Sequence, residues 1–517
     1  MNEPVTPTAP AATQAAPAAA QAAAHEDIAA LAKGGRTNFF GFLLRLAARL
    51  PFLFIAGRLY GAEALGRFAS AVIIIELAGQ LATLGQKRGL AQRLAEETRD
   101  PACVVADGML LSLLIGAVVA GLLLMVPAPM FPSGQYSQID RLLPLAIIPL
   151  SLTDIALAAL AFRYDVATTV RSRSVVEPWV LSIAAGILYF VIPESGLSIA
   201  YIVSIAAAAV FALIPLARSY GVPRDWRPRP LLLGRLALAS LPLAAADAVE
   251  WGTRKLDIAI LGIFASPAAV GVYYVAQQVA SLPQKLKTSF EPILGPVITR
   301  NVKEKNYHVI AQQVCQVGFW IIAAQAGIAL ALGIPGRAIM GLVGPNFTGG
   351  TGALAFLLAA EVVAATAVVS EAALIYLARI RNLYVSLATI AVQAVLTVGG
   401  IELVDHLGLP QLYRAAAAAA ALMLALGFAS VVKSRMLAKI LGERINNWRW
   451  PLAWAIGPAV VVGAATKLLP EWLELIVGIP AILGTYGFII WHRGFGPEDR
   501  VLFRKNVGGG GAAVEAA

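Results

Sequence analysis

Long apolar runs separated by short polar segments cover most of the chain after its first 36 residues. Runs such as 110–126 and 353–360 show no alternation of apolar and polar positions, so they predict helices and not the strands of a membrane barrel. A helix needs about 20 apolar residues to cross a bilayer, and it satisfies its backbone hydrogen bonds within one segment. The pattern therefore predicts an all-α polytopic membrane protein.

Fourteen transmembrane helices are expected from this pattern. The count falls to twelve if the last pair lies at the membrane surface instead of crossing it. The expected helices span 37–60, 66–86, 104–126, 142–162, 177–192, 197–217, 232–264, 268–299, 309–334, 351–377, 382–404, 412–432, 451–468 and 471–491.

Polar segments divide these helices into groups. The predicted organisation is a disordered N-terminal tail (1–36), a first lobe of six helices (37–219), a basic linker (220–231), a second lobe of six helices (232–432), a basic loop (433–450), two C-terminal helices (451–491) and a tail (492–517). The N-terminal tail is rich in Ala, Pro and Gln and has no apolar core, so it does not read as a signal peptide.

Composition agrees with a membrane protein, since 59% of the residues are hydrophobic, 14% are charged and the mean hydropathy is +0.75. The net charge of +10 comes largely from segments 87–99, 218–235, 300–305 and 433–449. Basic residues stay in cytoplasmic loops, so we expect a multi-pass inner-membrane protein with both termini in the cytoplasm. The charge then sets topology and does not indicate nucleic acid.

An internal repeat appears when the segment that begins at residue 57 is aligned with the segment that begins at residue 262. In both segments a helix ends, a short turn follows, and the next helix begins with a glycine and an aromatic residue, so that Gly66 falls on Gly271. The copies are six helices apart, an even number, so the two halves share one orientation and are related by an axis along the membrane normal. The repeat predicts two pseudo-symmetric six-helix lobes around a central cavity.

Four segments carry a resemblance to a known family: 33–41 (KGGRTNFFG), 57–68, 255–264 (KLDIAILGIF) and 270–274 (VGVYY). Together they resemble the polysaccharide-export family of the multidrug, oligosaccharidyl-lipid and polysaccharide exporter superfamily, over about residues 33 to 435. The resemblance implies transfer of an undecaprenyl-pyrophosphate-linked glycan from the cytoplasmic to the periplasmic leaflet, with polysaccharide polymerase machinery as a partner. Peptidoglycan-precursor flippases are less similar, and they imply a cationic cavity and the two added C-terminal helices.

Basic residues inside apolar helices are the first candidate site, because charges within a membrane usually face a water-filled path or a partner. Arg45 and Arg49 lie four residues apart on one helix face, so their guanidinium groups can converge on one pyrophosphate. The alternative is that both side chains extend to the cytoplasmic surface.

The seventh expected helix carries Asp247, Glu250, Arg254 and Asp257 on one stripe, with Lys255 beside it. One interpretation makes Arg254 and Lys255 substrate contacts and the three acids candidates for coupling to protons or sodium. The other makes the group a self-neutralising structural network between the lobes.

The eighth expected helix contains Pro283, Pro292 and Pro296, and we expect these prolines to interrupt it. A broken helix in a membrane lines a cavity or packs on protein. Lys285 and Lys287 near the break are therefore candidate contacts for the head group, unless they mark the helix end at the cytoplasmic surface.

Four further acids stand alone in apolar helices and are expected to be protonated or hydrogen-bonded packing groups. They are Glu76, Asp154, Glu361 and Glu371. The two cysteines, Cys103 and Cys315, indicate neither a disulfide framework nor a metal site.

The sequence contains no phosphate-binding loop of the ATPase type, so the driving force is expected to be the membrane potential or a cation antiport. No catalytic residue, cofactor or metal is expected, and the two lobes around one path predict a monomer. The alternatives are a drug or metabolite exporter of the same superfamily and a membrane-embedded glycan polymerase or ligase. Short polar loops disfavour the enzyme, and a mainly cationic cavity disfavours a cationic drug.

Overall fold

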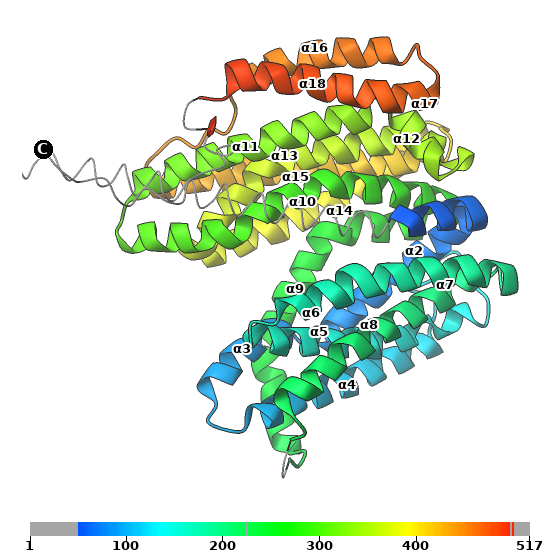
Figure 1. Ribbon diagram of the computed structural model, residues 1–517, viewed down its shortest axis with the longest axis vertical. Helices are drawn as coiled ribbons and strands as arrows, with labels where there is room; N and C mark the ends of the chain where they lie inside the picture. Colours follow the sequence, from blue (N-terminus) through cyan, green and yellow to red (C-terminus); the bar gives the residue numbers. More distant parts are fainter. Residues whose placement is uncertain (1–49, 224–225, 497–498, 501–517) are drawn as a thin grey trace, which may run out of the picture.

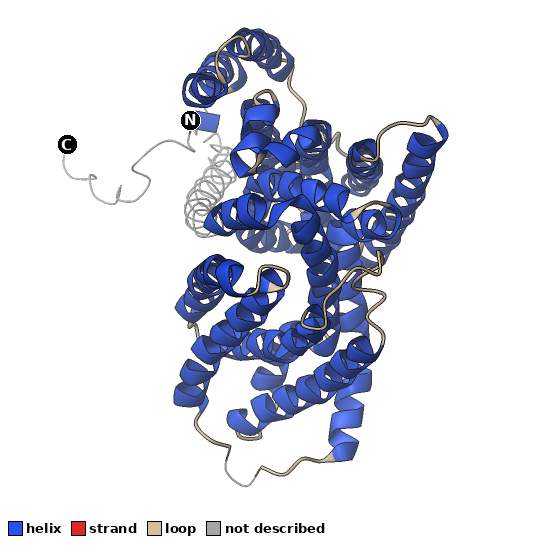
Figure 2. Ribbon diagram, turned by 90° about the vertical axis from the view of Figure 1, so that its right-hand side faces the viewer, coloured by secondary structure: helices blue, strands red, loops and turns tan. Residues whose placement is uncertain are grey.

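The structure is a computed structural model, and it describes residues 50–223, 226–496 and 499–500. Every regular element in these ranges is a helix (Figures 1 and 2). Eleven helical segments are long and apolar enough to cross a membrane, and the long α10 and the shorter apolar α16 add to them. Most of the first expected helix, with Arg45 and Arg49, lies outside the described residues.

Two bundles and a C-terminal pair make up the molecule, as Figure 1 shows. The N-lobe contains η2 (Ala56–Tyr60), α2 (Gly61–Ala82), α3 (Gln86–Glu96), α4 (Pro101–Met125), η3 (Asp140–Ala146), α5 (Ile147–Phe162), α6 (Val166–Thr169), η4 (Val170–Val176), α7 (Glu177–Val191) and α8 (Gly196–Tyr220). The C-lobe contains α9 (Pro230–Phe264), α10 (Pro267–Lys303), α11 (Tyr307–Gly333), α12 (Gly336–Val343), η5 (Pro345–Gly350), α13 (Thr351–Leu377), α14 (Arg379–His406) and α15 (Leu412–Leu441). The pair is α16 (Pro451–Thr466) with α17 (Glu471–Leu473), η6 (Glu474–Gly478), α18 (Ile479–Ile489) and η7 (Ile490–Gly494).

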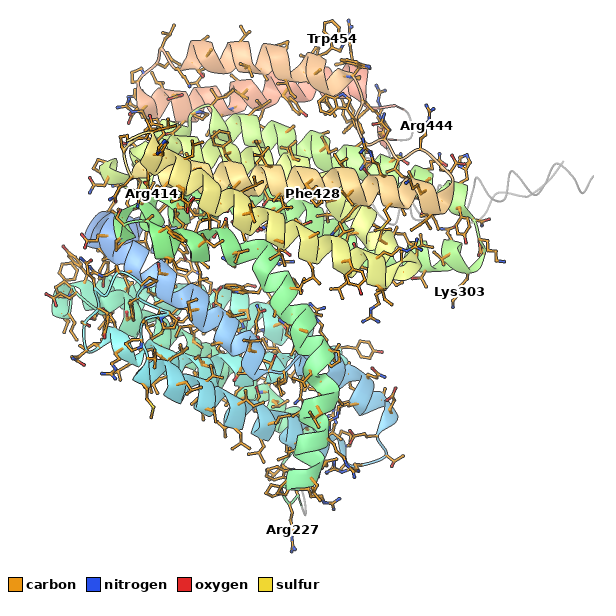
Figure 3. All side chains as sticks on the ribbon, turned by 180° about the vertical axis from the view of Figure 1, so that it is seen from behind. Arg227, Lys303, Arg414, Phe428, Arg444 and Trp454 are labelled. Atoms are coloured by element: carbon orange, nitrogen blue, oxygen red, sulfur yellow. The ribbon has the colours of Figure 1, made fainter. Side chains whose placement is uncertain are left out.

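The turns gather at two ends of the molecule. We call the end with turns 97–100, 163–165, 221–223, 226–229, 304–306 and 442–450 the basic end, and the end with turns 126–139, 192–195, 265–266, 407–411 and 467–470 the opposite end. Figure 3 shows the bundles close together near Arg414, at the opposite end, and spread apart toward Lys303 and Arg227 at the basic end.

The two lobes meet most closely where α2 crosses α10, and glycines make this crossing possible. A Cβ atom on Gly66 would lie 1.7 Å from the carbonyl oxygen of Pro267, and a Cβ on Gly271 would lie 2.0 Å from that of Ala62. Gly66 corresponds to Gly271 in the sequence repeat, and Ala62 to Pro267. The contact is therefore symmetric between the lobes, which confirms the predicted pseudo-symmetric architecture around a central axis.

Helix α9 belongs to the C-lobe by sequence but reaches across both lobes (Figures 1 and 3). Its first half packs on the N-lobe, where a Cβ on Gly85 would lie 2.4 Å from Cβ of Leu243. Its second half packs on the C-lobe, where Gly252 lies against Ile390 of α14. The helix thus links the two bundles along its length.

Helix α10 corrects the expectation of a broken eighth helix, because it is continuous from Pro267 to Lys303 through its three prolines. Neighbouring helices α2, α11 and α13 pack along it, and such packing lets transmembrane helices keep proline without breaking. The side chains of 285–297, including Lys285 and Lys287, lie outside the described part.

Two further boundaries differ from the sequence expectation. The helix expected from 177 begins at Val166 and passes through the π-helical segment η4. Helix α15 continues to Leu441, so Lys433 lies inside a helix and not in the expected loop from 433. A hydropathy window ends the predicted helix at the first charged residue. The helix in the structure can continue past that residue when its charge has a partner.

The C-terminal helices pack against each other and against α11, on which the hydroxyl of Tyr486 donates to the carbonyl oxygen of Ala323 at 2.9 Å. The segment after them, expected as a tail from 492, stays on the fold in its described part. Asp499 is buried and accepts hydrogen bonds from Trp320 at 2.8 Å and Arg449 at 2.6 Å. Burial raises the pKa of Asp499, but the hydrogen bonds from Arg449, the Gly496 amide and Trp320 outweigh it and hold this pKa below 3.8.

The glycine crossing gives a first prediction. Gly66→Ala forces a methyl group into the carbonyl of Pro267, and overpacking of this kind costs about 1–3 kcal/mol, so the melting temperature of the purified protein falls. Gly121→Ala is the control, because a Cβ there meets no atom within 4 Å, and it leaves the melting temperature unchanged or slightly higher. Equal melting temperatures for the two variants would contradict the close crossing.

Candidate functional site: a cavity between the lobes

A central cavity of about 1670 Å³ lies between the two lobes. Its walls come from α2 and α7 of the N-lobe, from α10, α13, α14 and α15 of the C-lobe, and from α9, which links them. The repeat predicted a cavity in this position, and the fold class with two lobes around it is confirmed.

The cavity is open toward the basic end and closed toward the opposite end. The side chains of Glu250 and Arg254 in its wall are 44% and 47% exposed. At the closed end the lining residues Phe68 and Val343 are buried, and Arg58 of η2 donates to the carbonyl oxygen of Leu342 at 3.0 Å. The α2–α10 crossing lies at the same closed end, so one set of contacts seals it.

Charges of both signs line the cavity. The described lining contains five basic residues, Arg88, Arg254, Lys255, Arg379 and Lys433, and five acidic ones, Glu76, Glu177, Glu250, Glu361 and Glu371. The sequence had indicated mainly cationic candidates, because it treated the acids as packing groups. It had also placed Arg88 and Lys433 in loops and not in the cavity wall. In the described part of the lining the formal charges balance.

The charged stripe of α9 is joined by a residue from the N-lobe. Arg88 of α3 binds Asp247 at 2.7 Å and also binds Glu250, while Arg254 binds Glu250 at 2.9 Å. Asp247 is 1% exposed, so Arg88 neutralises a carboxylate that solvent barely reaches. These pairs connect the two lobes at the level of the cavity.

The remaining members of the stripe have different surroundings. Lys255 lines the cavity and lies 3.5 Å from Oε1 of Gln277, whereas Asp257 is buried and accepts from Tyr273 and Gln277 of α10. Glu250, Arg254 and Lys255 therefore face the cavity, while Asp247 and Asp257 are held in the walls behind it.

The C-lobe wall near the basic end holds a second polar group that sequence reasoning missed. Lys433 of α15 binds Glu371 of α13 at 2.9 Å and donates to Ser386 of α14 at 3.2 Å. Asn382 of α14 donates to the same carboxylate at 3.3 Å. These groups come from three helices and carry no shared local signal in the sequence, and three-dimensional packing brings them together.

The N-lobe wall contains a third ionic group. Arg173, in the π-helical segment η4, binds Asp154 of α5 and Glu177 of α7, the latter at 2.9 Å. Glu177 faces the cavity. π-helical turns within α-helices are frequent at functional sites, and here the turn aims Arg173 between its two carboxylates.

Comparison with known proteins follows from this geometry. Residues 55–323, more than half of the chain, match the family model described as polysaccharide biosynthesis protein. The chain belongs to this family. No curated protein matches its sequence.

Solved transporters share its fold. One is described as the inward-facing conformation of a multidrug resistance MATE family transporter of the MOP superfamily, with 15% identity and a TM-score of 0.57 over 78% of this chain and 95% of that one. Another is described as a MOP superfamily transporter from Pyrococcus furiosus with a reversed polarity of the binding pocket, and it has 13% identity and a TM-score of 0.54 over 81% of this chain and 96% of that one. A third, described as MATE in complex with MaL6, has 15% identity and a TM-score of 0.56 over 81% and 97%. The chain thus has the fold of these solved transporters.

The described ranges contain no group of three or more His, Cys, Asp or Glu side chains that could hold a metal ion.

Removal of Arg88 is the second prediction. Arg88→Ala leaves Asp247 as a buried charge without its partner, so we expect a loss of about 2 kcal/mol and a lower melting temperature. The double variant Arg88→Ala/Asp247→Asn regains most of this loss, because the amide carries no charge.

Arg93→Ala is the matched control on the same helix. Arg93 pairs with Glu97 four residues away, an interaction that contributes about 0.2–0.5 kcal/mol, so the melting temperature of the Arg93→Ala variant stays close to that of wild type. If Asp247→Asn gave no recovery in the Arg88→Ala background, the ion pair would not be the source of the stability.

Proposed function

We propose that this protein is a flippase, which moves an undecaprenyl-pyrophosphate-linked oligosaccharide from the cytoplasmic to the periplasmic leaflet by alternating access. One observation carries the proposal: a two-lobed cavity, open at one end and sealed at the other, has Arg254 and Lys255 in its wall. Membership in a polysaccharide biosynthesis family on a transporter fold supports a substrate of this class.

The charges around α9 suit a pyrophosphate. Arg88, Arg254, Lys255 and Glu250 line the cavity, whereas Asp247 and Asp257 lie behind them in the wall, so the charges of this group that face the cavity are mainly positive. Arg254 uses part of its guanidinium on Glu250 and keeps further donors, which match the oxygens of a phosphate. The anionic group would therefore bind at this level of the cavity.

The size of the cavity suits a glycan. Sites for drug-sized molecules occupy about 300–1,000 Å³, and the cavity here is larger, about 1670 Å³. It could hold an oligosaccharide of several units, while the polyprenyl chain stays in the lipid. The cavity is also partly polar, as hydrated sugars require.

The basic end corresponds to the cytoplasm in this proposal, because loops near transmembrane segments retain Lys and Arg on the cytoplasmic side. The cavity is then open to the leaflet in which the lipid-linked glycan is made. A pyrophosphate that crosses outward moves toward the positive side of the membrane and gains about 2.3 kcal/mol per charge per 100 mV. The potential alone could drive transport, and the acids Asp247, Glu250 and Asp257 remain proposed sites for a coupling cation.

A drug or metabolite exporter is the second candidate. The equal numbers of acidic and basic residues in the described lining favour it, since such a wall does not reject a cation by its net charge. The experiment below distinguishes the two, because an exporter of drugs has no effect on lipid-linked glycans.

Lipid-linked intermediates provide the third prediction. A strain of the source organism without this protein accumulates polyprenyl-linked glycan on the cytoplasmic face. Arg254→Ala/Lys255→Ala, expressed at the wild-type level, reduces the complementing activity about tenfold or more, because a charge-assisted contact to phosphate contributes about 1.5–3 kcal/mol.

The matched control replaces one arginine and one lysine outside the cavity wall. Arg435→Ala/Lys439→Ala alters two exposed residues of α15, and it restores export like wild type. Normal export by the Arg254→Ala/Lys255→Ala variant would exclude this site, and absence of accumulation in the deletion strain would exclude the flippase function.

A further inference from the structure

The C-lobe polar wall consists of Glu371, Asn382, Ser386 and Lys433, all of which line the central cavity. They come from three helices, α13, α14 and α15, whose facing surfaces are otherwise largely apolar. Asn382 and Lys433 are 6% and 5% exposed, and Glu371 and Ser386 form the accessible edge. The wall stands apart from the charged group on α9 and is not explained by pyrophosphate binding.

The charge of this wall excludes a strong anion site. Lys433 is the cation, and Glu371 neutralises it at 2.9 Å. A phosphate that approached Lys433 would also meet the Glu371 carboxylate, and like charges repel at this distance. Around α9 the described lining contains three basic residues and one acidic residue, so the two parts of the cavity differ in the ligand that they favour.

The hydrogen-bonding groups of the wall remain partly unsatisfied. The Glu371 carboxylate accepts from Asn382 and Lys433, and Lys433 donates to Ser386, but Oδ1 of Asn382 is buried without a hydrogen-bond partner. A buried acceptor without a partner costs about 1–3 kcal/mol, and a ligand hydroxyl removes this cost if the Asn382 amide turns Oδ1 toward the cavity that it lines. Acceptors from a carboxylate and an amide therefore stand beside donors from an amine and a hydroxyl.

We infer that the C-lobe polar wall binds an uncharged pyranose ring of the glycan through neighbouring hydroxyl groups. Each sugar hydroxyl both donates and accepts, so a pair of them matches the alternating acceptors and donors of Glu371, Asn382 and Ser386. Tyr376, which lines the cavity and is 51% exposed, adds an aromatic face near the same wall. The inference rests on the proposed flippase function and assigns one part of the substrate to one wall.

Spacing along α14 agrees with this division. Gly252 of α9 lies against Ile390, and Asn382 is eight residues nearer the basic end on the same helix. Eight residues correspond to about 12 Å along a helix, which is roughly the length of two sugar units. Arg254 and Lys255 can thus hold the pyrophosphate while the wall holds a sugar of the same molecule.

The fourth prediction uses two probes on the purified full-length protein in nanodiscs. Farnesyl diphosphate carries the anion without a sugar, and farnesyl-diphospho-glucose adds one uncharged pyranose. Wild type binds the second probe more tightly. Asn382→Leu weakens the binding of farnesyl-diphospho-glucose about tenfold, because hydrogen bonds to the sugar are lost, and so does the milder Ser386→Ala. Both variants leave the binding of farnesyl diphosphate unchanged.

Gln393→Leu is the matched control, because Gln393 is another buried amide of α14 without hydrogen-bond partners but does not line the cavity. It leaves binding of both probes unchanged. Unchanged binding of farnesyl diphosphate also shows that each variant is folded.

The outcomes separate this inference from the function on which it rests. If wild type binds both probes and the wall variants weaken the binding of both probes equally, the sugar assignment is wrong while the flippase function stands. The same holds if the variants weaken the binding of neither probe. If wild type binds neither probe, the proposed function itself fails.

Discussion

The backbone contact between α2 and α10 is the constraint on which the rest of the structure depends. Two glycines, Gly66 and Gly271, allow each helix to touch a carbonyl oxygen of the other, and no side chain fits between them. Lipid tails are as apolar as the helices, so close packing and not hydrophobic burial holds such helices together. The contact fixes the lobes at one end only, and the cavity opens where they spread apart (Figure 3).

Pairing of charges follows from the apolar surroundings. Arg88, Arg173 and Lys433 each bind a carboxylate on a different helical segment. A charge in a membrane is costly without a partner, so these residues constrain which helices can be neighbours. Arg254 keeps donors that Glu250 does not use, and these donors lie in the cavity wall, where a substrate can reach them.

Hydropathy and the repeat predicted much of the fold, because both reflect local or symmetric constraints. The expected helices have counterparts in the structure, and the repeat had already placed Gly66 opposite Gly271 in sequence. Arg88 and Lys433 were assigned to loops because a charge ends an apolar window, and their partners Asp247 and Glu371 lie far away in the chain. Proline likewise indicated a break in α10, since sequence does not show the helices that pack along it.

The position of α9 explains why one helix matters for both binding and movement. Its first half packs on α3 of the N-lobe, its second half on α14 of the C-lobe, and Glu250, Arg254 and Lys255 face the cavity between these contacts. In the proposed function, a motion that opens the sealed end separates the lobes near the α2–α10 crossing, and α9 then bends or leaves one lobe. Leaving the N-lobe would separate Arg88 from Asp247 and Glu250, which exposes two carboxylates and frees a cation at the level of the pyrophosphate. Binding of an anion near Arg254 weakens the attraction of that side chain for Glu250, so the substrate acts on the same ion pairs that hold α9 in place.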